Sequence, residues 1–199
     1  MNWGSLAFDT ERQLVLAAVN HVPMVVTLVP RDQLEPMRDS GLYPDSEFAR
    51  QEGTPYAMRR EMLASPLGLP CSAPPWGTLA AVDLRRNAIR WQVMLGSTRD
   101  KTPWFIPPRT IGMPNMGGPM VTAGGLAFVG AATDNYLRAF DIDTGQELWK
   151  GRLPAGGQAT PMSYEANGRQ FVVIAAGGHG GLGTRQGDYV VAFALPAAQ

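Results

Sequence analysis

The sequence has little cysteine and no excess of charge of either sign. Cys71 is the only cysteine, which excludes an internal disulfide and a CxxC metal site. Lysine plus arginine total 17, as do aspartate plus glutamate, so the formal net charge is zero. A balanced charge gives no electrostatic reason to bind nucleic acid or an anionic membrane surface. We therefore expect no nucleic-acid partner.

Long apolar runs are also lacking. The most apolar stretch, residues 14–29, contains Asn20, His21 and Pro23 and is too polar for a transmembrane helix. The N-terminal residues lack the basic start and the cleavage site of a signal peptide. We therefore expect no targeting or membrane segment in this chain.

Apolar stretches with a helical period are nearly absent, whereas glycine and proline are plentiful, with 23 and 17 residues. Short apolar runs alternate instead with turn residues such as Gly124-Gly125 and Asn167-Gly168. Such a pattern predicts a mostly antiparallel β protein. The expected strands are residues 5–8, 13–19, 120–122, 126–130, 136–141, 147–153, 159–164, 171–176 and 189–194.

One stretch of the chain occurs twice, as Leu79–Trp91 and Leu137–Trp149, which start 58 positions apart (79 and 137). Each copy is an apolar run ending in Asp, a turn at Asn87 or Gly145, and a second run ending in Trp. Asn and Gly accept positive φ at little cost, as short hairpin turns require. Fixed-period hairpins with a recurring Trp indicate the blades of a β-propeller.

The repeat spacing also limits how many blades the chain can form. A closed propeller has about four to eight blades, whereas 199 residues at this spacing supply roughly three to four. The predicted fold is an all-β partial propeller of antiparallel four-stranded blades spanning residues 1–199. Residues 30–77 are rich in proline and break the pattern, so we expect a long irregular insertion there, with a helical turn or two within Phe48–Met62.

Candidate functional segments lie where strands are expected to end, because loops at the ends of blades face the propeller channel. They are Asn2-Trp3-Gly4, Met113–Pro119, and the pair Gly156–Pro161 and Gly177–Gly183. Glycine clusters let a ligand approach the backbone closely and expose amide groups to an anion. His179, flanked by glycines, could hydrogen-bond a carboxylate or exchange a proton. The alternative is that these clusters are simply tight turns.

Other candidates have structural explanations. Asp83 with Asp141, and Trp91 with Trp149, occupy equivalent repeat positions, so we expect turn and blade-packing roles for them. Asp134 is ambiguous, since an Asp-Asn pair is an ordinary turn but this loop could also face the channel. The sequence contains no complete metal constellation, catalytic triad or phosphate loop.

Several motifs together resemble one known family. They are Asn2-Trp-Gly, Ser65-Pro-Leu-Gly-Leu-Pro-Cys, Pro75-Trp-Gly-Thr-Leu-Ala-Ala-Val-Asp, Gly112-Met-Pro-Asn-Met-Gly-Gly-Pro, Tyr136-Leu-Arg-Ala-Phe-Asp, Leu153-Pro-Ala-Gly-Gly-Gln-Ala-Thr-Pro and Ala176-Gly-Gly-His-Gly. In this order they resemble the C-terminal part of membrane-bound, pyrroloquinoline-quinone (PQQ)-dependent glucose dehydrogenases and the related quinate dehydrogenases. The resemblance runs essentially from end to end. The repeated hairpin resembles that family's tryptophan-docking motif, in which each Trp wedges between adjacent blades of an eight-bladed propeller.

The resemblance implies an activity and a set of site residues. The family oxidises a sugar or cyclic polyol by hydride transfer to PQQ, and the electrons pass to ubiquinone. A bound Ca²⁺ or Mg²⁺ polarises the quinone carbonyl and an Asp takes the hydroxyl proton. By the same resemblance, Asn2 contacts the quinone edge and His179 lies beside the cofactor, with Asn115 and Asp134 near the cofactor or substrate face.

The resemblance also implies that parts of the site lie outside this chain. In the family the catalytic Asp, the metal ligands and most cofactor contacts precede the Asn-Trp-Gly segment, as do the helices that anchor the propeller on the periplasmic side of the inner membrane. We therefore expect a fragment that completes its site with the remainder of the propeller and is inactive alone. The alternatives are one chain of a split enzyme and a non-enzymatic propeller scaffold with Trp-docking repeats. A scaffold has no chemical need for the Asn-Trp-Gly and Gly-Gly-His-Gly segments.

Overall fold

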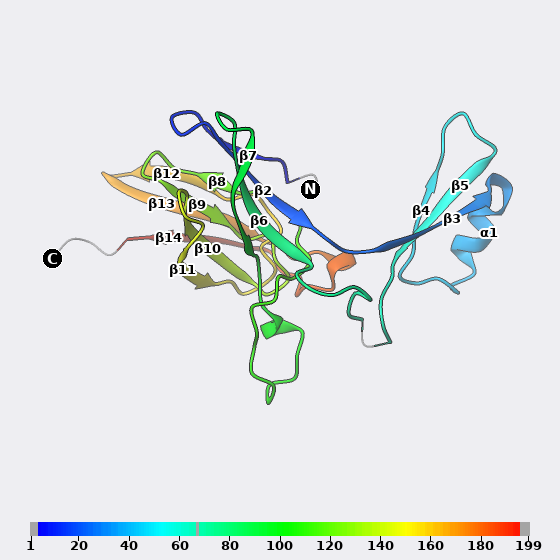
Figure 1. Cartoon of the computed structure of the whole chain (residues 1–199). Coiled ribbons are helices and arrows are strands. Elements are labelled where there is room, and N and C mark those ends of the chain that lie inside the picture. Colours follow the sequence, from blue (N-terminus) through cyan, green and yellow to red (C-terminus); the bar gives the residue numbers. More distant parts are fainter. Residues whose placement is uncertain (1–3, 67, 196–199) are drawn as a thin grey trace. The chain divides into compact units, whose positions relative to one another are not determined.

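The structure, a computed structural model, describes residues 4–66 and 68–195. The chain divides into two compact units (Figure 1). One consists of Met1–His21 with Pro74–Gln199, and the other is Val22–Ala73. The first unit contains all the segments that the sequence marks as candidate functional loops, so the site belongs to this unit.

Three antiparallel sheets form the described part of the first unit. The first has the order β1-β2-β6-β7, with β1 (Ala7–Asp9), β2 (Leu14–Asn20), β6 (Gly77–Asp83) and β7 (Ala88–Met94). The second has the order β11-β10-β9-β8, with β8 (Met120–Val121), β9 (Leu126–Val129), β10 (Tyr136–Asp141) and β11 (Glu147–Arg152). The third, with three strands among the described residues, has the order β12-β13-β14, with β12 (Met162–Ala166), β13 (Arg169–Ala176) and β14 (Tyr189–Ala194).

The predicted strands of this unit are confirmed, with bounds that shift by up to three residues. Two short 3₁₀ turns, η2 (Thr98–Asp100) and η3 (Gly180–Leu182), lie in the β7–β8 and β13–β14 connections. The blades of a propeller are antiparallel sheets of four strands, and two of these sheets have four strands. The predicted all-β, blade-forming architecture is therefore confirmed.

The repeated hairpin is confirmed in detail. Its copies are β6–β7 and β10–β11, with matching registers in which Ala81 faces Trp91 and Ala139 faces Trp149. Both copies have a register shift directly after that alanine. The turn residues Asn87 and Gly145 have φ of 52° and 75°, the left-handed conformation that the sequence predicted for them.

The repeated tryptophans join neighbouring sheets. Trp91 of β7 donates its indole N–H to the carbonyl of Ile142, in the turn between β10 and β11 of the second sheet, at 2.8 Å. Its ring also covers Gly145, where a Cβ atom would lie only 2.6 Å from the indole. Trp149 of β11 contacts Phe193 of β14 edge to face, with ring centroids 5.0 Å apart. The predicted packing role of both tryptophans is confirmed.

Two apolar clusters fill the spaces between the sheets. One joins the first sheet to the second and includes Leu14, Leu16, Leu79 and Phe140. The other joins the second sheet to the third and includes Ile174. Because each sheet buries one face against the next, the second sheet is held on both faces, and the loops at its end have a rigid support.

The aspartates at equivalent positions of the two hairpins hold turns, as predicted. Asp83 Oδ1 accepts hydrogen bonds from the backbone N–H groups of Arg85 and Arg86, at 2.9 and 3.0 Å. Asp141 Oδ1 accepts from the N–H of Asp143 at 3.0 Å and from the N–H and hydroxyl of Thr144, each at 2.8 Å. These bonds close the strand–turn–strand geometry of each repeat.

The second unit has regular structure where the sequence predicted an irregular insertion. Its sheet has the order β3-β5-β4, with β3 (Met24–Pro30), β4 (Glu47–Arg50) and β5 (Tyr56–Met62), and η1 (Arg31–Gln33) with α1 (Leu34–Asp39) follows β3. Its small core consists of Val29, Leu34 and Ala57, with Met37 and Phe48 packed against it. The predicted helical turn within Phe48–Met62 is wrong, because that range forms strands and the helix lies earlier.

The missing alternation of apolar and polar residues in these strands explains the error. Arg59, Arg60 and Glu61 are consecutive in β5, and the Arg60 guanidinium pairs with the carboxylate of Glu47 on the neighbouring strand. Four of the five β3 residues that precede its buried Val29 are apolar and yet exposed, so this strand lacks the alternation of apolar and polar residues that marks a half-buried strand. The assignment of residues 1–199 to one propeller arc stays a prediction.

Candidate functional site

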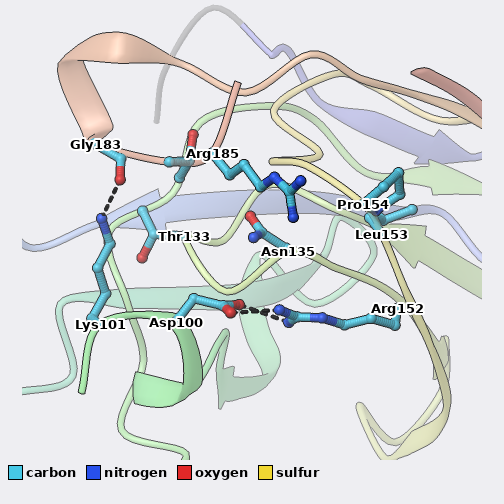
Figure 2. A pocket seen from close by; sticks show the side chains of 10 residues that line it. Asp100, Lys101, Thr133, Asn135, Arg152, Leu153, Pro154, Gly183 and Arg185 are labelled. Atoms are coloured by element: carbon cyan, nitrogen blue, oxygen red, sulfur yellow. Dashed lines mark hydrogen bonds and ion pairs between the residues drawn. The ribbon is translucent and has the colours of Figure 1, made fainter. Parts of the chain in front are cut away.

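A cavity of about 260 Å³ lies at one end of the second sheet (Figure 2). Four connections form it, namely β7–β8, β9–β10, β11–β12 and β13–β14. Its lining residues are Asp100, Lys101, Thr133, Asn135, Arg152, Leu153, Pro154, Gly183, Thr184 and Arg185. Most of them are polar or charged, so the cavity is suited to a polar ligand.

One wall of the cavity is a bidentate ion pair between Arg152 and Asp100 (Figure 2). Arg152 Nη1 donates to Asp100 Oδ2 at 2.7 Å, and Nη2 donates to Oδ1. Nη1 also donates to the backbone carbonyl of Asp134 at 2.8 Å. The hydrogen bond to Asp100 raises the pKa of Arg152 above its ordinary value, against a smaller opposing effect of burial. This two-pronged pair fixes the β7–β8 connection to the end of β11.

Lys101 ties a second connection into the cavity. Its ammonium donates to the carbonyls of Leu182 at 3.0 Å and Gly183 at 2.7 Å, both in the β13–β14 connection. Burial lowers the pKa of Lys101, and the charge of Asp100 opposes that effect in part. An ammonium has three N–H donors, and these contacts use two of them.

Two buried polar side chains face the cavity. Thr133 and Asn135 are 2% and 5% exposed, and Figure 2 shows both side chains at its wall. Thr133 Oγ1 and Asn135 Oδ1 have no hydrogen-bond partner among the described residues. A buried polar atom left unpaired costs about 1–3 kcal/mol, so such atoms are uncommon away from ligand sites.

Asp134, predicted to lie near the cofactor or substrate face, is fully buried between Thr133 and Asn135, at 0% exposure. Its carboxylate pairs with both Nη atoms of Arg138 and accepts from the N–H and the hydroxyl of Ser97, each at 2.7 Å. Burial alone would lower the pKa of Arg138, but its bonds to Asp134 and Glu147 outweigh that effect and raise it. The Asp134 carboxylate thus stabilises the β9–β10 connection through these buried bonds. Its direct contact with the cofactor stays a prediction.

Asn115 is also buried, at 2% exposure. Its side-chain amide donates to the carbonyl of Val19 at 3.0 Å. Its backbone N–H and carbonyl both bond to the side chain of Asn20, at 2.8 and 2.7 Å. Asn115 also forms an isolated bridge with Ala132 of the β9–β10 connection. It therefore joins the end of β2 to the loop of the second sheet, and its predicted contact with the cofactor is untested.

His179 is half-buried and begins the η3 turn. Its backbone N–H donates to Thr184 Oγ1 at 2.8 Å, and this hydroxyl donates to Gln158 Oε1 at 2.9 Å. The Gln158 amide N–H₂ then donates to the carbonyl of Ala132 at 3.0 Å. These bonds connect the His179 loop to the β9–β10 connection. Asn2, the remaining predicted cofactor contact, lies outside the described residues.

The predicted residues Asn115, Asp134 and His179 therefore converge on one short segment, residues 132–135. Sequence reasoning missed the residues that assemble it, above all Gln158 and Lys101. The sequence predicted a functional loop at Gly156–Pro161, which contains Gln158. It did not predict that the Gln158 side chain links the His179 loop to the β9–β10 connection. Lys101 had no sequence signal, because its partner carbonyls lie 81 and 82 positions away.

Metal ligands are not grouped in this part of the protein. Across residues 4–66 and 68–195, no cluster of three or more His, Cys, Asp or Glu side chains is placed to hold a metal ion. Within the same residues, none of the helices has the length and hydropathy to span a bilayer. The candidate site described here is thus a set of hydrogen-bonding and cationic groups.

Comparison with known proteins assigns the chain to a family. The family described as "PQQ: Glucose/ethanol/alcohol dehydrogenase, beta-propeller domain" matches residues 1–172. The chain is 46% identical over 201 residues to the quinoprotein glucose dehydrogenase of Escherichia coli K12, covering 98% of this chain and 25% of that protein. It is 43% identical over 206 residues to a probable quinate dehydrogenase (quinone) of Xanthomonas campestris pv. juglandis, covering 100% of this chain and 26% of that protein.

A solved structure agrees with these relatives. The quinohemoprotein alcohol dehydrogenase from Comamonas testosteroni matches with a TM-score of 0.57 and 25% identity, over 97% of this chain and 26% of that one. The chain thus spans about a quarter of the length of the proteins it matches. Both the identity over nearly the whole chain and the shared blades confirm the resemblance found in the sequence. The chain belongs to the family of PQQ-dependent glucose, ethanol and alcohol dehydrogenase β-propeller domains.

Proposed function

We propose that this chain forms part of a PQQ-dependent sugar or polyol dehydrogenase and supplies one wall of its cofactor site. The observation that supports this most is the hydrogen-bonded link from His179 through Thr184 and Gln158 to Ala132. It joins the glycine-rich His179 loop to the loop that carries Asp134, and these are loops that the resemblance predicts beside the cofactor and near the cofactor or substrate face.

The residues of the His179 loop fit a flat, polar quinone. A Cβ added to Gly177 would meet only the carbonyl of Gly187, at 3.7 Å, so the backbone there is open to a ligand. A Cβ on Gly181 would lie 3.2 Å from His179 Cε1, so a larger residue would crowd the imidazole. The loop thus presents a histidine beside bare backbone, which a planar ring can approach closely.

PQQ, when bound, supplies the quinone that accepts the hydride of the oxidised alcohol. The roles of this chain are to bind and orient it. His179 would hydrogen-bond the cofactor from its imidazole, Asn2 would donate to the quinone edge through its amide, and Asn115 and Asp134 would hold the surrounding loops in place. The Gln158 link keeps the histidine loop at a fixed distance from the second sheet.

The rest of the site lies, in this proposal, in the other part of the propeller. That part would supply the catalytic Asp and the ligands of Ca²⁺ or Mg²⁺. The substrate would be a sugar or cyclic polyol, the electron acceptor ubiquinone, and the location the periplasmic side of the inner membrane. The isolated chain would then be inactive even with PQQ and metal added.

A chimera tests the proposal. The matching quarter of the E. coli quinoprotein glucose dehydrogenase is replaced by this chain, reconstituted with PQQ and Mg²⁺, and assayed by glucose-dependent dye reduction. We expect activity from the chimera and none from the isolated chain or from the host lacking its matching quarter. A chimera that folds and binds PQQ but reduces no dye with glucose, quinate or glycerol would refute the proposed activity. Dye reduction by the isolated chain above a no-protein control would refute its dependence on the other part.

A further inference from the structure

The cavity beside the cofactor wall has an excess of positive charge. Lys101, Arg152 and Arg185 line it, and Asp100 is the one acidic side chain among its lining residues. Because Asp100 already pairs with Arg152 through both carboxylate oxygens, these two charges largely cancel. The charge presented to a ligand is therefore that of Lys101 and Arg185.

Both of these cations have donors to offer. Lys101 uses two of its three N–H groups on the carbonyls of Leu182 and Gly183. Arg185 is exposed, and within the described residues its guanidinium has no ion pair. Figure 2 shows the Arg185 side chain extending across the cavity toward Asn135. An anion in the cavity would thus meet one ammonium and one guanidinium.

The buried wall requires a different kind of partner. Asn135 Oδ1 accepts hydrogen bonds, and Thr133 Oγ1 both accepts and donates, yet neither has a partner among the described residues. A fully ionised oxyanion has no proton to give to an amide oxygen. A ligand that satisfies this wall must therefore carry hydrogen-bond donors, which hydroxyl groups supply, as well as a negative charge.

We propose that this cavity binds a small polyhydroxylated carboxylate, with the carboxylate at Lys101 and Arg185 and hydroxyls at Thr133 and Asn135. The site itself rests on this geometry. That the ligand is a sugar acid, the oxidised product class of a sugar dehydrogenase after hydrolysis of a lactone, rests on the proposed function. Oxidation of a sugar at its anomeric carbon gives a lactone, and addition of water opens the lactone to the hydroxy acid.

A ligand in the cavity would affect the loop that forms the proposed cofactor wall. Lys101 holds the carbonyls of residues 182 and 183, and Thr184 both lines the cavity and bonds to the backbone of His179. A carboxylate that draws on the Lys101 ammonium acts on the same loop that presents His179. Ligand binding would therefore affect the loop that presents His179, the proposed cofactor contact.

The two lysines of the chain provide the test. Lys101 and Lys150 are the only lysines, and Lys150 is exposed on β11 and paired with Glu147 outside the cavity. The folded 199-residue chain is acetylated with a lysine-specific reagent, and the rate at each lysine is measured by mass spectrometry. The probes are gluconate, glucose, PQQ, and sodium chloride at matched ionic strength.

Gluconate should protect Lys101 and leave Lys150 unchanged. At ten times its dissociation constant a ligand leaves about one site in eleven free, so acetylation of Lys101 should slow by about tenfold. Glucose and sodium chloride should give little protection. The near-isosteric Thr133→Val variant should need a several-fold higher gluconate concentration for the same protection, with an unchanged rate at Lys150 as the check on folding.

Three results would overturn the proposal. They are equal protection by glucose and gluconate, protection of Lys101 by sodium chloride alone, and no protection by gluconate at any concentration that leaves Lys150 unaffected. In the third case, protection by PQQ would show that the cavity belongs to the cofactor. The gluconate result requires neither PQQ nor catalysis. This test can therefore fail while the dye-reduction test succeeds, or succeed while the dye-reduction test fails.

Discussion

The contact between Trp91 and Gly145 makes a sharp prediction about what holds neighbouring blades together. A Cβ atom on Gly145 would lie 2.6 Å from Cε3 and 2.7 Å from Cδ2 of the Trp91 indole, and the φ of Gly145 is 75°. Gly145→Ala therefore introduces two costs, a strained backbone and an overlap with the docked ring. Neither the ring nor the turn can move freely, because the indole N–H is bonded to the carbonyl of Ile142.

A second glycine separates the two costs. Gly168 has a φ of 69°, but a Cβ there would meet nothing within 4 Å. The left-handed conformation costs an alanine about 1–2 kcal/mol. Overlap in a packed site adds about 1–3 kcal/mol. We therefore expect Gly168→Ala to lower the free energy of unfolding by about 1–2 kcal/mol and Gly145→Ala to lower it by about 2–5 kcal/mol.

Urea unfolding followed by far-ultraviolet circular dichroism measures both changes. The difference between the two variants isolates the Trp91 contact, provided that the dependence on urea is the same. Adding Trp91→Leu should shrink the effect of Gly145→Ala toward that of Gly168→Ala, because the ring that blocks the new methyl group is gone. Equal losses for Gly145→Ala and Gly168→Ala would refute the docking geometry.

Three further predictions concern stability. Trp91→Phe removes the indole donor to Ile142 and should lower the free energy of unfolding by about 0.5–1.5 kcal/mol in urea unfolding, whereas a change below the error of the fit would mean that this bond contributes nothing. Asp134→Ala leaves Arg138 buried without its main partner and should lower it by about 3–5 kcal/mol, measured in the same way, so a loss under 1 kcal/mol would contradict the buried pair. The bonds from Thr144 lower the pKa of Asp141 below its ordinary value of 3.8, so its stabilising effect is full above that value and is lost as the pH falls through the lowered pKa. In thermal unfolding from pH 7 to pH 2, Asp141→Asn should therefore be less stable than the wild type near neutrality and approach it in acid, and a gap that is constant with pH would contradict the assignment.

The repeated hairpins were predictable because their signals are local. An Asp that closes a turn, an Asn or Gly with positive φ and an alternating run ending in Trp all act within about a dozen residues. The same locality predicted the strands from residue 120 onward. By contrast, the sheet of the second unit has only a small core, carries exposed ion pairs such as Arg60–Glu47 and leaves most of β3 exposed, so the sequence of its strands lacks the alternation of apolar and polar residues.

The site was predictable only in part, because its contacts join distant residues. His179 and Asp134 could be placed near one another through the resemblance to a family. The pairing of Asp134 with Arg138, four residues later, and with Ser97 could not be predicted. An Asp-Asn turn gives the same sequence pattern whether its carboxylate faces a ligand or a buried guanidinium. The cavity itself depends on Lys101 reaching Gly183, a contact that only the packing of the blades creates.

The most direct test of the central claim, that this chain forms a wall of the PQQ site, is the affinity of the chimera for PQQ. Equilibrium titration of the chimera with PQQ compares His179→Ala with a matched variant of the only other histidine, His21→Ala, whose ring contacts Thr78 instead. We expect His179→Ala to weaken binding by about threefold to tenfold, the loss of one hydrogen bond, and His21→Ala to leave it unchanged. A folded chimera that binds PQQ equally well with and without the His179 imidazole would contradict the account.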